Sequence, residues 1–473
     1  MKNSFYNKKF FISLIILIIT IFTTSFLYRD ISRSVYFQWI DHYWYILMFT
    51  TVLIILMMRM LEFRWMSFSG WFLILLFVFH FGHVFLTEIN YEFVRSYNMI
   101  SAYRGENMQV TLLISFLFFL GTVLGVILGL RSSSDNSVKT VKYNKFVTRE
   151  IAWVYLLVTS PFYFYYQINI LSSVASGNYM NSFNTFETGI IGDIAFLFYY
   201  ALILLICSYF EDDRKFWAAV SVSFSILMIS MASGGRGQQM LCILLIGLII
   251  LKKIKFNFSF LKIVGIAIIF YLIMGILNTI GDLRLLENIN LQLFVDMFVQ
   301  KLTQNPIVEI VEELGGTIQT PFRIYQQVPT QTPYGYGKTF ILSFVTIIPN
   351  IASILDIWLD DINFMRHITG VALGGSYIGE LYYNFSLFGF FVSIIFGNVI
   401  QALSKKMEQS LDNKNYIHFI MYVPIFVFGL WWVRGNFSGI IRTMVWNAIS
   451  IFMIKTFILQ LRASLGKIST ISK

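Results

Sequence analysis

The stretch FWAAVSVSFSILMISMASGGRGQQMLCILLIGLIIL, residues 216–251, holds two apolar runs separated by the short turn SGGRGQ (233–238). A helix that crosses the hydrocarbon core of a bilayer needs about 20 apolar residues, and both runs approach that length. Because backbone polar groups in lipid must be satisfied within the segment, the pair predicts a transmembrane helical hairpin. Its turn would hold Arg236 at the edge of the membrane.

The whole chain shares this apolar character. Of its 473 residues, 57% are hydrophobic, 18% are aromatic and only 13% are charged, which is too little polar surface for a soluble globule. The first apolar run follows three lysines and lacks a small-residue cleavage site, so we expect a retained anchor rather than a removed signal peptide. Residues 1–473 are therefore predicted to form a single all-α polytopic membrane domain.

Apolar runs of crossing length predict about twelve transmembrane helices. The predicted spans are residues 10–27, 44–58, 67–87, 108–130, 151–172, 189–210, 216–232, 238–251, 257–279, 386–404, 416–433 and 440–461. If the N-terminus is cytoplasmic, alternate connections hold 23 of the 35 basic residues. This fits the positive-inside bias and places both termini in the cytoplasm. Since the lysines cluster beside spans, the net charge of +10 indicates no nucleic-acid partner.

The cations predicted to lie outside are mostly arginines. Ten arginines and two lysines lie there, whereas lysine outnumbers arginine seventeen to six on the inner side. The planar arginine fork grips phosphate or carboxylate in two places, so the bias indicates an anionic ligand. A lysine-biased genome that retains arginine at structurally satisfied positions explains the bias equally well. The outer arginines are Arg29, Arg33, Arg95, Arg104, Arg236, Arg284, Arg323, Arg366, Arg434 and Arg442.

Three outer arginines, Arg104, Arg236 and Arg434, are followed directly by glycine. Glycine lets the backbone approach a ligand closely and tolerates positive φ. Arg442, eight residues after Arg434, lies near the start of the last span, where an ionisable residue is a functional candidate. Snorkelling or helix capping is the structural alternative for each. The glycines around Arg236 are Gly234, Gly235 and Gly237.

The segment 281–385, between the ninth and tenth predicted spans, holds five of the seven prolines. Loops of this length usually carry function, and we expect a large structured extracytoplasmic loop. Pro306 should begin a helix whose glutamates, at 309, 312 and 313, form a solvated face. The apolar run 339–355 could cross, but a single crossing would invert the later topology. We therefore expect it to re-enter or to pack within the protein, and leave an extra pair of crossings open.

The loop ends in GGSYIGELYYNFSLFGF, residues 374–390, which places Glu380 at the lip of the bilayer. A carboxylate there is unfavourable unless it is paired or used, so Glu380 is either a functional acid or the partner of an outer arginine. His80 and His83 share a helix face, and without further ligands they indicate a polar, cavity-facing pair rather than a metal site. No carboxylate pair indicates a divalent metal, and no cofactor is expected.

These features resemble the Wzy-type oligosaccharide repeat-unit polymerases of O-antigen and capsule biosynthesis. The resemblance rests on a dozen spans, the GGRG hairpin, a long loop with YGYGKTF and IIPN, and GGSYIGELYYNFSLFGF before a span, and it covers residues 190–445. In that family a glycine often follows the Asn-aromatic pair, where this chain has Ser386. The resemblance implies transfer of a growing glycan from undecaprenyl diphosphate to a new lipid-linked repeat unit, at the outer face of the bacterial cytoplasmic membrane.

This chemistry assigns roles to the candidate residues. Arginine donors would stabilise the diphosphate leaving group, and an acceptor hydroxyl needs a base, for which Glu380 is the candidate. The expected donors are Arg236, Arg434 and Arg442. The expected substrate-binding residues are Gly234, Gly235, Gly237, Arg104, Arg323, Arg366 and Tyr377. Expected partners are undecaprenyl-diphosphate-linked oligosaccharide, membrane lipid, a flippase and a chain-length regulator, with lipopolysaccharide or capsule as the destination of the polymer.

Three other functions remain open at this point. A flippase for lipid-linked oligosaccharide has about twelve spans, but it would show repeat symmetry and short loops. An O-antigen ligase shares the donor and differs in its acceptor. A non-enzymatic scaffold or sensor would leave the outer arginines and Glu380 without a role.

Overall fold

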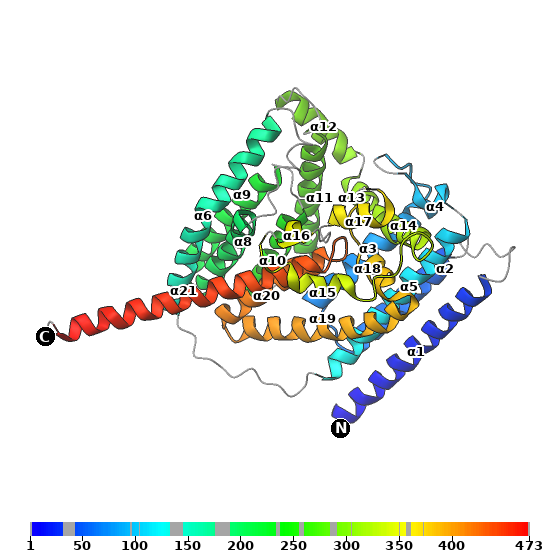
Figure 1. Cartoon of the computed structure of the whole chain (residues 1–473), viewed down its shortest axis with the longest axis horizontal. Helices are drawn as coiled ribbons and strands as arrows, with labels where there is room; N and C mark the ends of the chain where they lie inside the picture. Colours follow the sequence, from blue (N-terminus) through cyan, green and yellow to red (C-terminus); the bar gives the residue numbers. More distant parts are fainter. Residues whose placement is uncertain are drawn as a thin grey trace.

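The computed structural model describes residues 2–31, 43–94, 97–103, 105–132, 145–175, 190–232, 237–254, 260–283, 291–303, 305–349, 351–355, 361–371 and 373–471. Within these residues the chain is helical and contains no strand. Figure 1 shows long helices arranged around a group of short ones, with the C-terminal part of the last helix extending away from the rest. The all-α expectation is confirmed.

The long helices coincide with the twelve predicted spans. They are α1 (Lys2–Ile31), α2 (Tyr43–Met60), α3 (Phe68–Glu88), α5 (Glu106–Ser132), α6 (Lys145–Ala175), α8 (Ile190–Ser208), α9 (Asp213–Ala232), α10 (Gly237–Ile254), α11 (Phe260–Leu283), α19 (Gly389–Asp412), α20 (Tyr416–Trp431) and α21 (Ser438–Ile471). Among the described residues, eight helices are long and apolar enough to cross a membrane: α2, α3, α5, α8, α9, α10, α21 and the run that ends in α19. The chain is a multi-pass membrane protein, whereas the count of twelve is not confirmed.

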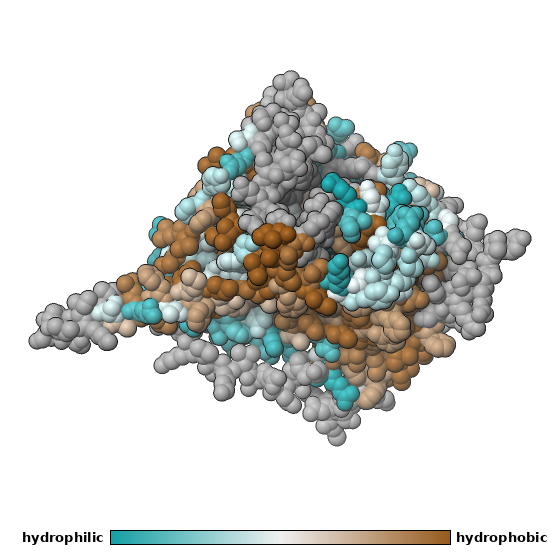
Figure 2. All heavy atoms as spheres, in the orientation of Figure 1, coloured by the Kyte–Doolittle hydropathy of each residue, from teal (hydrophilic) through white to brown (hydrophobic). Residues whose placement is uncertain are grey.

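Short helices fill the segment 281–385 and the ends of the bundle. They are α4 (Met99–Ala102), α12 (Leu291–Thr303), α13 (Pro306–Gly315), α14 (Gln319–Gln327), α15 (Lys338–Val345), α16 (Ile351–Ile354), α17 (Asp361–Thr369) and α18 (Tyr377–Phe385), with single 3-10 turns at Gly316–Ile318 and Ser386–Phe388. In Figure 2, polar residues gather over α14 and α17, and apolar residues dominate around α15 and α19.

The apolar run 339–355 does not cross the membrane as one helix. It forms α15 and the four-residue α16, and the eight residues of α15 rise only about 12 Å. Helix α15 packs against α21, and the Trp446 indole donates a hydrogen bond to the Ile347 carbonyl. One face of the segment thus packs on α21, whereas Ile341, Phe344 and Ile348 are more than half exposed. Re-entry and packing within the protein both stay predictions for this segment.

Helix α5 is the centre of the bundle, and glycines let α19 approach it. A Cβ at Gly125 would collide with the carbonyl oxygen of Ile394, and one at Gly397 would collide with that of Thr122. Gly121 faces Ser393 in the same way, where a Cβ would also collide. Small residues at four-residue spacing give such close contact between membrane helices. The repeat GTVLGVILG of α5, at 121–129, therefore determines which helix it meets.

Ion pairs join the lysine-rich connections at one end of the bundle. Arg64 pairs with Glu408 of α19 at 2.9 Å, and Lys414 pairs with Glu211 at 2.6 Å. At the same end, Lys252 of α10 pairs with Asp412. These residues belong to connections that the charge pattern predicts on one side of the membrane, so the alternating path through the bilayer agrees with the packing.

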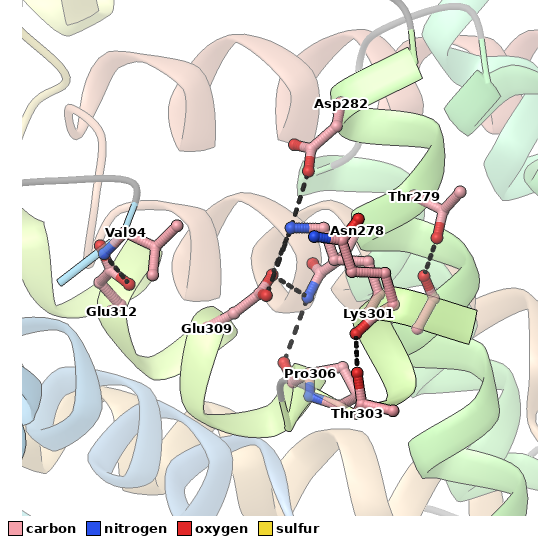
Figure 3. Close-up of polar contacts among 11 residues, drawn as sticks. Val94, Asn278, Thr279, Asp282, Lys301, Thr303, Pro306, Glu309 and Glu312 are labelled. Carbon is pink, nitrogen blue, oxygen red and sulfur yellow. Dashed lines mark hydrogen bonds and ion pairs between the residues drawn. The ribbon is translucent and has the colours of Figure 1, made fainter. Parts of the chain in front are cut away.

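The expected solvated face of α13 is wrong for two of its three glutamates. Glu309 is 1% exposed and Glu312 is 0% exposed. The Glu309 carboxylate accepts from Lys301 at 3.3 Å and from Asn278 at 3.2 Å, and Lys301 also pairs with Asp282 at 2.8 Å. Figure 3 shows this cluster between α11, α12 and α13. Because α12 and α11 contribute the partners, the helix pattern of α13 alone could not reveal the burial.

Candidate functional site

Two motifs from distant parts of the sequence meet backbone to backbone. The turn WVRGNF, 432–437, connects α20 to α21, and the segment GGS, 374–376, leads into α18. A Cβ at Gly375 would lie 2.6 Å from the carbonyl carbon and oxygen of Gly435, so only glycine fits there. The Tyr377 amide donates to the Val433 carbonyl at 3.4 Å. The start of α18 is therefore attached to the turn that carries Arg434.

We call the contact between the WVRGNF turn and the GGS segment the junction. The end of the hairpin motif SGGRGQ also lies at this junction. Gly237 is the first residue of α10, and a Cβ there would collide with the ring of Trp431 at the end of α20. Arg236 precedes this glycine, but it lies outside the described residues, as do Gly234 and Gly235. The position of Gly237 nevertheless brings the end of the SGGRGQ turn next to the WVRGNF turn.

Glu380 of α18 joins these elements through three hydrogen bonds. Its Oε2 accepts from the Trp432 indole at 2.6 Å and from the Phe437 amide at 3.0 Å. Its Oε1 accepts from the Thr339 hydroxyl at 2.7 Å. The donors on Oε2 lie on either side of Arg434 and Gly435. The carboxylate thus fixes both ends of the arginine-bearing turn and links them to α15.

The surroundings of Glu380 are closed and mainly aromatic. The residue is 1% exposed, and the ring of Trp432 packs edge-on against Tyr377 and Phe396, with centroids 4.7 and 4.9 Å apart. No cation pairs with Glu380 in the part of the chain that the structure describes. Two expectations are affected: Glu380 has no described arginine partner, and in this conformation it is shielded from an acceptor hydroxyl.

Local sequence explains how α18 presents Glu380. Ser376 is the N-cap of α18, and its hydroxyl accepts from the Gly379 amide at 3.2 Å. The imidazole of His80, buried in α3, lies 2.8 Å from the same hydroxyl. His80 and His83 are both 0% exposed, and His83 lies 2.9 Å from the Glu312 carbonyl. The two histidines therefore make helix contacts rather than facing an open cavity.

The two candidate arginines of the C-terminal region differ in their partners. The stem of Arg434 passes Gly374, where a Cβ would lie 3.8 Å from both its Cγ and its Nε. Arg434 makes no ion pair with any described residue. Arg442, in contrast, donates to Asp193 of α8 from Nε at 3.1 Å and from Nη2 at 2.5 Å. Among the described residues, Arg434 is thus an available cation at the junction, and Arg442 belongs to a structural ion pair.

The remaining predicted substrate-binding residues are dispersed. Arg323 of α14 donates to the Tyr103 hydroxyl at 3.3 Å and lies over its ring, and Arg366 is exposed on α17. Tyr377 is 0% exposed, and its hydroxyl lies 3.1 Å from that of Thr122. Arg104 lies outside the described residues.

Sequence reasoning missed three residues of the junction: Trp432, Thr339 and Ser376. A carboxylate at a membrane edge signals a need for donors, but the sequence does not show which distant donors satisfy it. A serine directly before a segment rich in apolar residues was an available helix-start signal for Ser376.

The comparisons with known proteins give one match. The family model described as O-antigen polysaccharide polymerase Wzy matches residues 9–463, which is nearly the whole chain and includes all three motifs of the junction. No curated protein and no solved structure matches.

Proposed function

The chain belongs to the O-antigen polysaccharide polymerase Wzy family, and from this premise we propose how its junction of three motifs polymerises repeat units. Members of the family act on lipid-linked oligosaccharide repeat units in the membrane and join them into O-antigen polysaccharide. The proposal concerns the donor, the residues that act on it, and the side of the membrane.

The proposed glycosyl donor is the growing glycan on undecaprenyl diphosphate. The bond between the anomeric carbon and the diphosphate oxygen breaks, and a hydroxyl of the new repeat unit forms a glycosidic bond to that carbon. The hydroxyl proton passes to water, and undecaprenyl diphosphate leaves with the bonding electrons. Negative charge therefore grows on the diphosphate as the bond breaks. Hydrogen-bond donors held in place around the diphosphate stabilise this charge and lower the activation barrier.

Arg434 is proposed to donate hydrogen bonds to the diphosphate, together with Arg236, which precedes Gly237 in sequence. The observation that carries this role is the bracing of the Arg434 turn by Glu380, through Trp432 on one side and Phe437 on the other. A fixed turn loses little conformational entropy when Arg434 engages phosphate, and its guanidinium can bind two oxygens at once. One such donor is worth about 3 to 4 kcal/mol of transition-state stabilisation in other enzymes.

Glu380 then acts as a positioning residue rather than as the base. Its two oxygens already accept from three donors, so a proton from an acceptor could reach it only if the turn or Thr339 moved. Arg442 is proposed to hold α21 against α8 through Asp193. These roles replace the direct catalytic roles that the sequence favours for Glu380 and Arg442.

The proposed location is the outer face of the bacterial cytoplasmic membrane, with both termini in the cytoplasm. The ion-paired, lysine-rich end of the bundle supports this orientation, because basic connections remain in the cytoplasm. A flippase would supply repeat units to that face, and a chain-length regulator would act on the product. Lipopolysaccharide is the proposed destination of the polymer, with capsule as the other.

A reconstituted reaction tests the proposal. The purified chain in lipid nanodiscs receives lipid-linked repeat units extracted from cells that lack the polymerase, and products are sized by gel. We expect a ladder of lipid-linked polymers without any lipid A-core acceptor, which neither a flippase nor a ligase would make. Arg434→Lys should slow the reaction roughly 10- to 100-fold, while Arg462→Lys at the opposite end should not change it.

Orientation has its own test. Thr330→Cys and Asn413→Cys place single thiols on exposed positions at the two ends, and the native Cys207 and Cys242 are buried. An impermeant thiol reagent should label position 330 in whole cells and leave position 413 unlabelled. The reverse pattern would place the junction in the cytoplasm and exclude the proposed site.

A further inference from the structure

An open cavity lies at the C-terminal end of α18, apart from the three donors that bind the Glu380 carboxylate. Its volume is about 490 Å³, within the range of about 300 to 1,000 Å³ that is usual for small-molecule sites. The lining residues are Tyr334, Tyr336, Asn384, Phe385, Ser386 and Phe388. Four of the six are aromatic, and the other two are polar.

Unusual backbone conformations shape the walls of this cavity. Tyr336 has φ 48° and Ser386 has φ 52°, values that L-residues with side chains rarely adopt. Gly337, next to Tyr336 in sequence, has φ 84°. The Gly335 amide donates to the Tyr383 carbonyl at 2.9 Å and holds the segment against α18. Residues held in such conformations concentrate at ligand sites, because the surrounding structure must enforce them.

The side chain of the strained Tyr336 is largely exposed rather than packed. Tyr336 is 79% exposed, and its hydroxyl has no hydrogen-bond partner among the described residues. Among the described aromatic rings, it meets that of Tyr334 alone, edge-on with centroids 6.2 Å apart. Burial therefore does not offset the unfavourable φ of Tyr336, and a ligand that stacks on the ring would.

Polar groups line the same cavity. The Ser386 hydroxyl donates to the Tyr334 hydroxyl at 3.1 Å. Asn384 is 1% exposed, and its amide donates to the Thr339 hydroxyl and to the Glu380 carbonyl, each at 2.8 Å. Rings with an apolar face beside hydroxyl and amide groups match a sugar, which has an apolar ring face and a polar edge.

We propose that this cavity binds a sugar ring of the oligosaccharide repeat unit, stacked on Tyr336 and hydrogen-bonded by Tyr334 and Ser386. The proposal rests on the proposed function. Ser386 follows Glu380 by six residues, which is about 9 Å along a helix, and Asn384 and Thr339 connect the two places by hydrogen bonds. The cavity is thereby connected to the carboxylate that braces the Arg434 turn.

Anchoring in the membrane interface is the competing explanation for exposed aromatic residues. Phe388 is 73% exposed and Phe391 is 59% exposed, as expected for rings that face lipid. Phe391 lies on α19 and does not line the cavity. Its ring contacts that of Phe388, with centroids 6.3 Å apart. It still serves as the control, because its removal changes exposed aromatic surface and leaves Tyr334, Tyr336 and Ser386 in place.

The test measures binding without polymerisation. The probe is the free oligosaccharide released by mild acid from the lipid-linked repeat unit of cells that lack the polymerase. Saturation-transfer NMR titrations on protein in nanodiscs should show that Tyr336→Ala and Tyr336→Gly weaken affinity by at least about tenfold. Phe391→Ala should leave affinity unchanged. The glycine variant suits φ 48°, so its loss of binding would not reflect unfolding.

Two results would overturn the inference: wild-type affinity in both Tyr336 variants, or equal loss in Phe391→Ala. Neither result depends on catalysis. If the oligosaccharide binds as expected but the nanodisc reaction makes no polymer, the proposed function fails and the sugar site stands. If polymer forms but Tyr336 variants bind normally, only the sugar site fails.

Discussion

Replacement of Glu380 by glutamine or alanine separates bracing of the Arg434 turn from general-base catalysis. In Glu380→Ala, the Trp432 indole and the Phe437 amide lose their acceptor. Each unsatisfied buried donor is unfavourable by about 1 to 3 kcal/mol, so the two together destabilise the fold by about 2 to 6 kcal/mol. The Thr339 hydroxyl can rotate to another acceptor and adds less.

In Glu380→Gln, one oxygen remains to accept from both N–H groups. The new amide nitrogen would face the Thr339 hydroxyl, whose oxygen has a second lone pair beside the bond it accepts from Asn384. Loss of the charge weakens the hydrogen bonds but removes the desolvation penalty of a buried carboxylate with no cation beside it. These opposing effects leave stability within about 1 kcal/mol of wild type.

The assays are thermal unfolding in detergent and the glycan ladder in cells. We expect Glu380→Gln to keep a wild-type ladder, and Glu380→Ala to lose both ladder and thermal stability. Glu408→Gln, at the lysine-rich end, serves as the control for loss of a half-buried carboxylate away from the junction. A glutamine variant that is abundant and thermally normal, yet displays single repeat units only, would refute bracing and identify Glu380 as the base.

Three further predictions concern packing. Gly375→Ala should displace the turn and shorten the ladder, because its Cβ would lie 2.6 Å from backbone atoms, whereas Gly247→Ala, in open space on α10, should be neutral or stabilising by up to about 1 kcal/mol in thermal unfolding. Gly125→Ala should separate α5 from α19, a destabilisation of about 1 to 3 kcal/mol visible as lower membrane abundance; normal abundance would argue against close packing there. Lys301→Met should destabilise by about 3 to 5 kcal/mol, since Glu309 would remain buried without its cation, and adding Glu309→Gln should restore part of the thermal stability.

Much of the architecture is local information and could be predicted. Insertion of an apolar run such as 238–251 into the bilayer depends on the run itself and not on the helices that pack against it. Its length and composition therefore predict a membrane helix. The clustering of lysines in alternate connections likewise predicted which connections share one end of the bundle. The glycines of SGGRGQ and of GGSYIGE marked the segments that meet at the junction, although they did not indicate that they meet each other.

The environment of each polar group depended on the tertiary structure. Glu309 and Glu380 are both glutamates on short helices of the same region, yet one has Lys301 and Asn278 as partners and the other has Trp432, the Phe437 amide and Thr339. Nothing in their own segments distinguishes them. The sequence by itself determined that the chain lies in a membrane, that it is helical and where it turns. These properties depend on the length and composition of each apolar run, which are local to one segment. Only the folded chain decided which carboxylate is paired and which braces a turn, because hydrogen bonds and glycine contacts act over a few ångströms between segments far apart in sequence.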